Sequence, residues 1–581
     1  MENMPHSKSA IKESSNNRLL ILSLSCLMGV IGGLFAAVLR FLIEIISYFF
    51  TEILLPHISL VIQDYNLGYL LLPTIGGLIV GIIISKFSKE VQGSGIPYLL
   101  ESMTFKSAKI SPRVGLFKTI ATSISIGTGG SAGKEGPIAL IAASFGSFFG
   151  GKLSLRPENK RLLMTCGLAA GIAGTFGAPA GGALFGLEIL YQGITLSAGI
   201  PVFLAAVIGS VVTGLFYGYD NIFAVDFDLS SIKIAEYPIF ILLGVFCAIV
   251  AYLHIFSYKK ISRLFHKMKI PLFIKPAIGG LLVGLLIMFY PDSGLYGTGF
   301  NGIQQAFDEN LALGMLVILL ILKILASSAT IGSGGSGGVF APLVYIGCMA
   351  GGAFGTAGNS LFPSLISTPA LYCILGSAAV FSASAQAPLN ISLIIAEMTG
   401  HFDVFPPLIV TSISSYYVGR IFFKGSSIYT LILGRKGHHL KADTIYLLGT
   451  TQVHEIMSTN LVTVSSSIKI SDFAQLSNQY HPLNKFPVVD FGNLKGIAFI
   501  DDINKIPYNS WESTTIKSIM RTEHTIISAK ATLQEAMDRM NQYNLRALVV
   551  AEKIEGTDKY NLQGLVTFND IISVWQKERK K

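Results

Sequence analysis

A lysine and a glutamate stand side by side in a glycine-rich break within a long apolar tract. The stretch reads GTGGSAGKEGP and runs from Gly127 to Pro137, with Lys134 and Glu135 near its end. Glycine lets the backbone approach an ion closely, and proline fits the first turn of a helix. The pattern indicates an ion site at the start of a helix, with a simple Lys134–Glu135 ion pair as the alternative.

A phosphate-binding loop is excluded at this stretch. The P-loop pattern is G-x-x-x-x-G-K-[ST]. If Gly133 and Lys134 supply its Gly-Lys pair, the first glycine falls on Thr128, and Glu135 replaces the Ser/Thr. No Ser/His/Asp, metal-ligand or phosphate-loop constellation stands out elsewhere, so we expect neither an enzyme nor a required cofactor.

The composition is that of a protein with many membrane spans. Of the 581 residues, 51% are hydrophobic and 13% are charged, whereas soluble proteins carry about 25% charged residues. Apolar runs approaching or exceeding the roughly 18 residues needed to span a bilayer recur from Leu19 to about Thr430. The five cysteines are scattered in these runs without a CxxC pair, as expected of small buried hydrophobes. Examples of the runs are 19–39, 203–217, 238–256 and 311–329.

The net charge of +9 comes from short basic clusters that cap the apolar runs. By the positive-inside rule these clusters lie in the cytoplasm. Their shortness and position argue against a nucleic-acid partner.

Two halves of the apolar region repeat each other, at about 20–225 and 235–430. Four matches keep their order along the chain, and the third of them pairs the glycine-rich breaks Gly127–Pro137 and Gly332–Pro342. Duplicated membrane halves are often inverted, with a site at the midplane where helices are broken. Free N–H groups at such helix starts attract anions. The matched segments are 73–81 with 276–284, 93–95 with 297–299, 118–137 with 323–342, and 178–188 with 387–397.

Three short motifs, GSGIP, GKEGP and GVFAP, follow one another and precede a tyrosine. They occupy Gly93–Pro97, Gly133–Pro137 and Gly338–Pro342, and the tyrosine is Tyr429. Together they resemble the CLC family of chloride channels and chloride/proton antiporters, over essentially the whole chain. The resemblance implies an all-α polytopic membrane domain with two inverted repeats, and a homodimer with a separate ion path in each subunit.

The resemblance also implies a chloride site and a gate. Ser94 and Tyr429 resemble residues that hold a central chloride through their hydroxyls. The alternatives without a chloride role are that Ser94 caps a helix and that Tyr429 is an aromatic residue at the membrane interface. Glu135 resembles the gating glutamate, whose carboxylate competes with chloride and moves aside when protonated. Since bound chloride and ionised Glu135 repel, transport should depend on pH. The implied chloride ligands are Ser94, Gly95, Ile96, Val339, Phe340 and Tyr429.

Two positions depart from the family pattern. Lys134 stands where the usual motif has arginine, which keeps the charge but loses the bidentate fork. Ile189 stands where the antiporters usually carry a proton-relaying glutamate, directly after the one that Glu188 matches. Isoleucine cannot carry a proton, so the sequence leans toward a passive channel, with the antiporter as the alternative. Glu188 and its counterpart Glu397 are interpreted mainly as structural, and a role for Glu188 in a proton route stays open.

The last 130 residues alternate short strand-like and helical stretches, and they also repeat. Residues 453–480 match 516–543, and the pattern resembles a pair of CBS domains. Such pairs often bind adenine nucleotides, which implies Thr567 and Asp570 as ribose ligands and Asp502 as a weaker candidate, because Phe499 replaces the hydroxyl. A CBS pair that binds no ligand and only supports the dimer is equally expected. For the whole protein, a membrane-bound nucleotide sensor without transport is the third hypothesis, after the channel and the antiporter.

These observations predict a membrane protein of a bacterial inner or plasma membrane, with both termini and the CBS pair in the cytoplasm. Its partners would be chloride, protons if it is an antiporter, the lipid bilayer and a second copy. The predicted parts are a cytoplasmic tail at 1–17, a membrane domain at 18–437, a linker at 438–451, and CBS motifs at 452–509 and 510–581.

Overall fold

The computed structural model describes residues 6–573, apart from 64, 107, 226–231, 435–447, 449–450, 481–483, 523–524, 544, 555–556, 558 and 572. The chain divides into two compact units at about residue 442. The predicted linker at 438–451 lies almost wholly outside the described residues. The first helix begins at His6, within the segment 1–17 that was predicted as a cytoplasmic tail.

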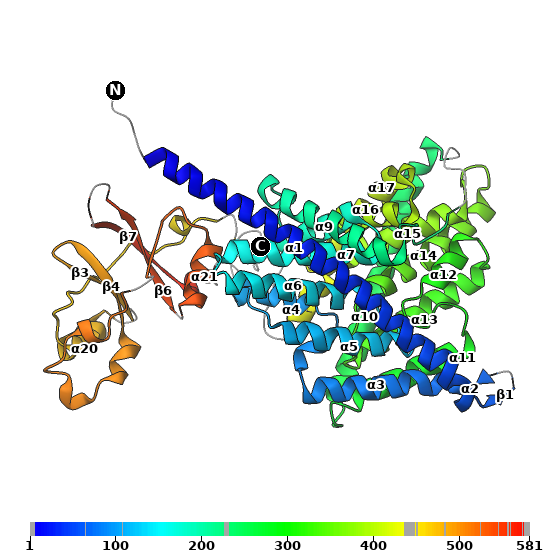
Figure 1. The fold of residues 1–581 in the computed structure, drawn as a ribbon, viewed down its shortest axis with the longest axis horizontal. Helices are drawn as coiled ribbons and strands as arrows, with labels where there is room; N and C mark the ends of the chain where they lie inside the picture. The colour runs from blue at the N-terminus through cyan, green and yellow to red at the C-terminus, as the bar shows by residue number, and fades with distance from the viewer. Residues whose placement is uncertain are drawn as a thin grey trace. The chain divides into compact units, whose positions relative to one another are not determined.

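The first half of the membrane unit is a succession of helices joined by short turns (Figure 1). Proline occupies the first turn of several of them, where its missing N–H costs nothing. The helices are α1 (His6–Tyr48), continued by a π-helical turn and α2 (Leu55–Ile58), then α3 (Gly68–Lys86), α4 (Ile96–Phe105), α5 (Pro112–Gly127), α6 (Glu135–Lys152), α7 (Pro157–Phe176), α8 (Pro179–Phe185) and α9 (Leu196–Tyr217).

The second half repeats this order: the helices from α11 to α17 correspond one by one to those from α3 to α9. This correspondence confirms the two predicted repeat halves. The helices are α10 (Tyr237–Lys267), α11 (Lys275–Phe289), α12 (Phe300–Phe307), α13 (Leu313–Gly332), α14 (Phe340–Leu361), α15 (Pro369–Ala385), α16 (Pro388–Thr399), α17 (Phe405–Phe423) and α18 (Ile428–Gly434).

Glycines explain why the two halves meet closely at α3 and α11. A Cβ at Gly77 would collide with the carbonyl oxygen of Pro276, and one at Gly280 would collide with that of Pro73. The two contacts are equivalent under the repeat. Small residues let helix backbones approach within a membrane, where helix association depends on packing.

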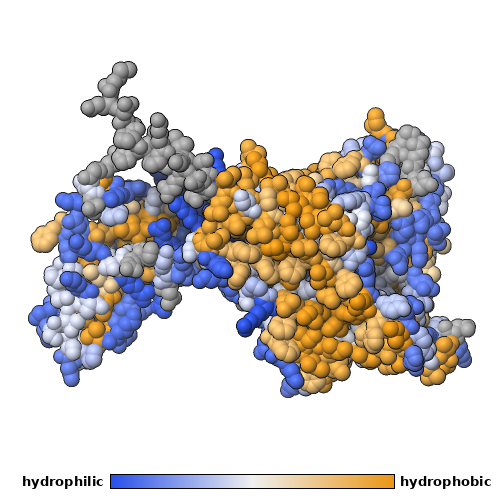
Figure 2. All heavy atoms as spheres, viewed as in Figure 1, coloured by the Kyte–Doolittle hydropathy of each residue, from blue (hydrophilic) through white to orange (hydrophobic). Residues whose placement is uncertain are grey.

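The outer surface of the helical unit is apolar. Six of the described helical segments are long and apolar enough to cross a membrane, Arg18–Ile58 and Phe340–Leu361 among them. Figure 2 shows apolar residues, in orange, over the face of this unit that is in view. Exposed apolar side chains lie along α1 and α9, for example Val38, Phe41 and Leu215. The helical unit is therefore built to sit in a bilayer.

The second unit consists of two small α/β motifs. In the first, β3 (Lys485–Asp490) pairs antiparallel with β4 (Asn493–Phe499), and α20 (Ile470–Gln479) packs beside them. In the second, the sheet order is β5 (Ile526–Ile527), β6 (Ala547–Lys553) and β7 (Tyr560–Thr567), with α21 (Leu533–Gln542). A shared apolar cluster that includes Ile497, Val549 and Leu565 joins the motifs.

Candidate ion-binding site

The three motifs found in the sequence each lead into the start of a helix. GSGIP leads into α4 at Ile96, GKEGP into α6 at Glu135, and GVFAP into α14 at Phe340. The first backbone N–H groups of a helix have no partner within it and carry the positive end of its dipole. Three such helix starts are therefore available to hold an anion.

The glycine-rich breaks of the two halves bond directly to each other. Gly133 and Gly338 exchange two backbone hydrogen bonds, at 2.9 and 2.7 Å. Gly93 donates to the carbonyl of Gly335 at 2.9 Å and accepts from the N–H of Gly337 at 3.2 Å. The structure thus brings GSGIP, GKEGP and GVFAP to one place at the interface of the halves.

The Glu135 side chain lies fully buried at this meeting point. Its Oε1 accepts a hydrogen bond of 2.6 Å from the N–H of Phe340, while Oε2 is buried and no described residue bonds to it. A Cβ at Gly338 would collide with Glu135 Oε1, and one at Gly133 with Oε2. The glycines therefore make room for a carboxylate that occupies the start of α14, where an anion would bind.

Two hydroxyls that sequence reasoning assigned to chloride are also buried without partners. Ser94 is 2% exposed and Tyr429 is 1% exposed, and within the described part of the chain neither hydroxyl oxygen has a hydrogen-bond partner. A Cβ at Gly136, the residue after Glu135, would collide with the carbonyl oxygen of Ser94. A buried hydroxyl without a partner is costly unless a ligand or water completes it.

The backbone at the other predicted ligands suits close approach. Gly95 adopts a φ of +86°, which glycine tolerates without strain. Ile96 begins α4, and Val339 is the residue just before α14; both are buried. The predicted ligands thus fall on two of the three converging helix starts, and Tyr429 comes from α18.

Two buried lysines were missed by sequence reasoning. Lys118 Nζ donates to the carbonyls of Val91 (2.9 Å) and Gly93 and to Ser336 Oγ (2.9 Å), so it holds the loop before Ser94. Lys323, its repeat counterpart, donates to the carbonyl of Gly294 at 2.8 Å. The available signal was a lysine at the first position of both matched segments.

Lys134 does not form the simple ion pair that was the alternative reading of the motif. Among the described residues, no ion pair joins it to Glu135. Its ammonium instead lies 5.6 Å from the centre of the Phe300 ring. Glu135 is consequently not held in place by a direct ion pair with its sequence neighbour.

Glu188 and Glu397 cap each other's helices across the repeat. Glu188 accepts hydrogen bonds from the N–H groups of Leu389 (3.4 Å) and Asn390 (2.9 Å), at the start of α16. Glu397 accepts from Ala180 (3.0 Å) and Gly181 (2.7 Å), at the start of α8. These contacts explain the matching glutamates as reciprocal caps.

Ile189 lies in the π-helical turn Gly186–Tyr191 that follows α8, and it is 5% exposed. Its side chain is buried and apolar, directly after the capping residue Glu188. The position offers no group that could exchange a proton.

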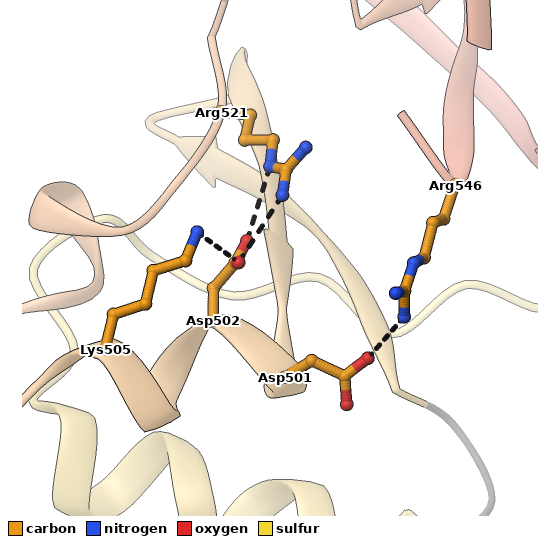
Figure 3. Close-up of polar contacts among 5 residues, drawn as sticks. All are labelled: Asp501, Asp502, Lys505, Arg521 and Arg546. Carbon is orange, nitrogen blue, oxygen red and sulfur yellow. Dashed lines mark hydrogen bonds and ion pairs between the residues drawn. The ribbon is translucent and has the colours of Figure 1, made fainter. Parts of the chain in front are cut away.

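The CBS candidates have different surroundings. At the end of β7, the Thr567 N–H donates to Asp570 Oδ2 (2.8 Å) and the Asp570 N–H donates to Thr567 Oγ1 (3.2 Å). Asp502 instead binds two cations, Lys505 at 2.7 Å and Arg521 at 3.3 Å (Figure 3). Burial opposes ionisation of Asp502, but the hydrogen bonds from Lys505 and Arg521 outweigh it and hold the Asp502 pKa below its ordinary value.

Family models match each of the two structural units separately. Residues 76–420 match the voltage-gated chloride channel model, and residues 453–508 and 516–577 each match the CBS domain model. The two CBS matches confirm the predicted pair.

Curated relatives match more than half of the chain. An uncharacterized protein of Methanocaldococcus jannaschii is 33% identical over 402 residues, which cover 69% of this chain and 93% of the relative. The voltage-gated ClC-type chloride channel ClcB of Escherichia coli O9:H4 (strain HS) is 28% identical over 361 residues, 61% of this chain and 85% of that protein.

Solved structures share the fold. A slow cyanobacterial Cl⁻/H⁺ antiporter superimposes with a TM-score of 0.64 at 25% identity, covering 72% of this chain and 97% of the antiporter. A eukaryotic CLC transporter gives a TM-score of 0.65 at 20% identity and covers 95% of this chain and 98% of its own, which shows a common fold.

Proposed function

This chain belongs to the voltage-gated chloride channel (CLC) family, and from that premise we propose that its membrane unit carries chloride through the meeting point of the two glycine breaks. The family comprises channels and transporters and is not a family of enzymes. The observation that carries the proposal is that Ser94 Oγ, Tyr429 Oη and Glu135 Oε2 are buried and have no hydrogen-bond partner among the described residues.

In this mechanism the Glu135 carboxylate occupies the outer anion position itself. It accepts the Phe340 N–H at the start of α14, the kind of donor that an anion would use. Chloride and ionised Glu135 cannot share this place, because like charges in a buried site repel strongly. Protonation removes the charge, frees the donor and opens the path. The Ser94 and Tyr429 hydroxyls hold chloride by neutral donors, so that it can leave again.

We favour passive conduction over proton exchange because Ile189 is buried and apolar where a proton-relaying carboxylate would stand. Glu188 beside it accepts three hydrogen bonds from Leu389 and Asn390, which supports a structural role. The second candidate, a chloride/proton antiporter, is favoured by the similarity to the slow cyanobacterial antiporter.

We also propose that the protein acts as a homodimer with one path per subunit. The CBS pair then faces the cytoplasm and regulates transport, with an adenine nucleotide as the candidate ligand at Thr567 and Asp570. The basic clusters that cap the apolar runs support this orientation.

The test is the reversal potential of purified protein in liposomes, first with a chloride gradient and then with an added pH gradient. A reversal potential that follows chloride alone identifies a channel. A shift with the pH gradient, or uphill proton movement driven by chloride, identifies an antiporter. Absence of any chloride flux would refute the proposal as a whole.

A further inference from the structure

Two equivalent backbone bridges join the CBS motifs. Ser458, before the first motif's helix, exchanges two hydrogen bonds with Leu565 in β7, both at 2.9 Å. Arg521, at the corresponding place of the second repeat, exchanges two with Ile497 in β4, both at 2.9 Å. The internal repeat relates Ser458 to Arg521 and Leu565 to Ile497. The two backbone bridges are thus equivalent, whereas the side chains at the equivalent positions, Ser458 and Arg521, differ.

Arg521 covers the end of the first motif with its guanidinium. Its Cζ lies 5.1 Å from the centre of the Phe499 ring, and its Nε and Nη2 lie 3.3 and 3.4 Å from the two Asp502 oxygens (Figure 3). Lys505 adds a second cation at 2.7 Å, and Asp502 is only 5% exposed. Phe499 and Asp502 are the repeat counterparts of Thr567 and Asp570, so Arg521 contacts both positions from within the chain.

Among the described residues, no arginine or lysine makes such a contact at the end of the second motif. Ser458 is exposed, and its short side chain cannot reach across as arginine does. Thr567 and Asp570 bond to each other's backbone N–H groups. In the part of the chain that the structure describes, no cation lies within ion-pair distance of Asp570. The two motifs are therefore unequal at the positions where they should be alike.

We infer that Arg521 fills the first CBS motif from within the chain, so that Asp502 fastens the two motifs together and does not contact a nucleotide. Displacing Arg521 would leave a nearly buried carboxylate short of one of its cations, which is strongly unfavourable. Phe499 has no hydroxyl to offer a ligand. The inference rests on the proposed regulatory role of the CBS pair only for the choice of a nucleotide as the probe.

Tryptophan fluorescence of the full-length protein tests the fastening role. The chain has two tryptophans, at positions 511 and 575, both beyond the membrane unit, and the signal of Trp511 follows unfolding of the first CBS motif. Trp511 packs against the core of the first motif and donates to the Ile506 carbonyl at 3.1 Å. Thermal midpoints would be measured for Asp502→Asn, Arg521→Met, the double variant, and Asp501→Asn as the matched control.

If Asp502 and Arg521 hold the two motifs together, each single variant lowers the thermal midpoint by several degrees. The midpoint of the double variant then falls by less than the sum of the two single decreases. Such non-additivity is the signature of a direct interaction. Asp501 pairs with Arg546 at 2.9 Å, but the two side chains are 62% and 76% exposed. Exposed pairs contribute little, so Asp501→Asn should leave the midpoint unchanged. Additive losses, or an Asp502→Asn midpoint equal to that of the control, would overturn the inference.

A second series adds millimolar ATP to the wild type and to Asp502→Asn. If Asp502 only holds the motifs together, the change in thermal midpoint caused by ATP is the same in both proteins, whether or not that change is zero. If ATP raises the wild-type midpoint and this protection disappears in Asp502→Asn, Asp502 contacts the nucleotide and the inference is wrong. Chloride flux is measured separately, so failure of the proposed transport function would not be confused with either result.

Discussion

At the scale of single residues, the site is marked by polar atoms that are buried and incomplete. Ser94, Glu135 and Tyr429 each keep an oxygen without a partner, whereas Lys118 beside them is fully satisfied by backbone carbonyls and a hydroxyl. A buried polar atom that lacks a protein partner can take an ion or a water as its partner. This difference separates the residues proposed to contact chloride from the lysine that positions their loop.

Glu135→Gln tests the gate at this scale. The carboxamide keeps the shape of the side chain but carries no charge at any accessible pH. We therefore expect chloride efflux from liposomes to rise severalfold on acidification for the wild type, and to be high and independent of pH for the variant. A variant that retains the wild-type pH response would show that another group gates the path.

Removal of the two hydroxyls tests the chloride ligands. A hydrogen bond to a charged group contributes about 1.5–3 kcal/mol, so Ser94→Ala or Tyr429→Phe should weaken chloride binding about tenfold or more. Isothermal titration of the purified protein with chloride measures this change. Ser144→Ala is the control, because this buried Oγ already donates to the Ile141 carbonyl of its own helix at 2.7 Å. Equal affinities for all three variants and the wild type would contradict the assignment.

At the scale of elements, the site depends on where helices begin. The α6 and α14 starts are tied together by the Gly133–Gly338 bridge, and α4 starts one residue after Gly95, whose positive φ turns the chain. Because each half supplies one of the two bridged breaks, neither half alone contains the site. The reciprocal caps of Glu188 and Glu397 hold α16 and α8 by the same exchange between halves.

Gly338→Ala tests the fit between the α14 start and the gate. The new methyl group would collide with Glu135 Oε1, and the flexible end of that side chain can move away more easily than the backbone. We expect the variant to conduct chloride at neutral pH severalfold faster than the wild type, approaching Glu135→Gln. Gly151→Ala serves as the control, since no atom lies within 4 Å of its added Cβ. Wild-type flux in a folded Gly338→Ala protein would show that the carboxylate position does not limit conduction.

At the scale of the whole molecule, the membrane unit and the CBS unit each consist of a duplicated half. In the membrane unit the equivalent glycines Gly77 and Gly280 preserve the symmetry where the halves touch. In the CBS unit the symmetry is broken by Arg521, which stands where its counterpart is Ser458. Duplication explains the architecture, and the departures from it identify the positions with individual roles.

The CBS unit should lose stability in acid, and Asp502 should account for part of the loss. Its pKa in the folded unit lies below the ordinary value because the hydrogen bonds from Lys505 and Arg521 outweigh burial. The stabilisation is complete above the unfolded pKa of about 4 and disappears as the pH falls through the folded pKa. Tryptophan-monitored melting across this range should show a shallower acid loss for Asp502→Asn. Parallel pH profiles for the variant and the wild type would refute this contribution.

The sequence by itself determined the class of protein, the two repeat halves and the CBS pair. These features rest on local patterns, namely apolar length, repeated segments such as 118–137 and 323–342, and the glycines and prolines at helix starts. Only the tertiary structure decided that Glu135 accepts the Phe340 N–H, that Glu188 and Glu397 cap each other's helices, and that Arg521 neutralises Asp502. The first two contacts join residues about two hundred positions apart, and the third crosses between motifs. Their partners are selected by packing, which no local pattern encodes.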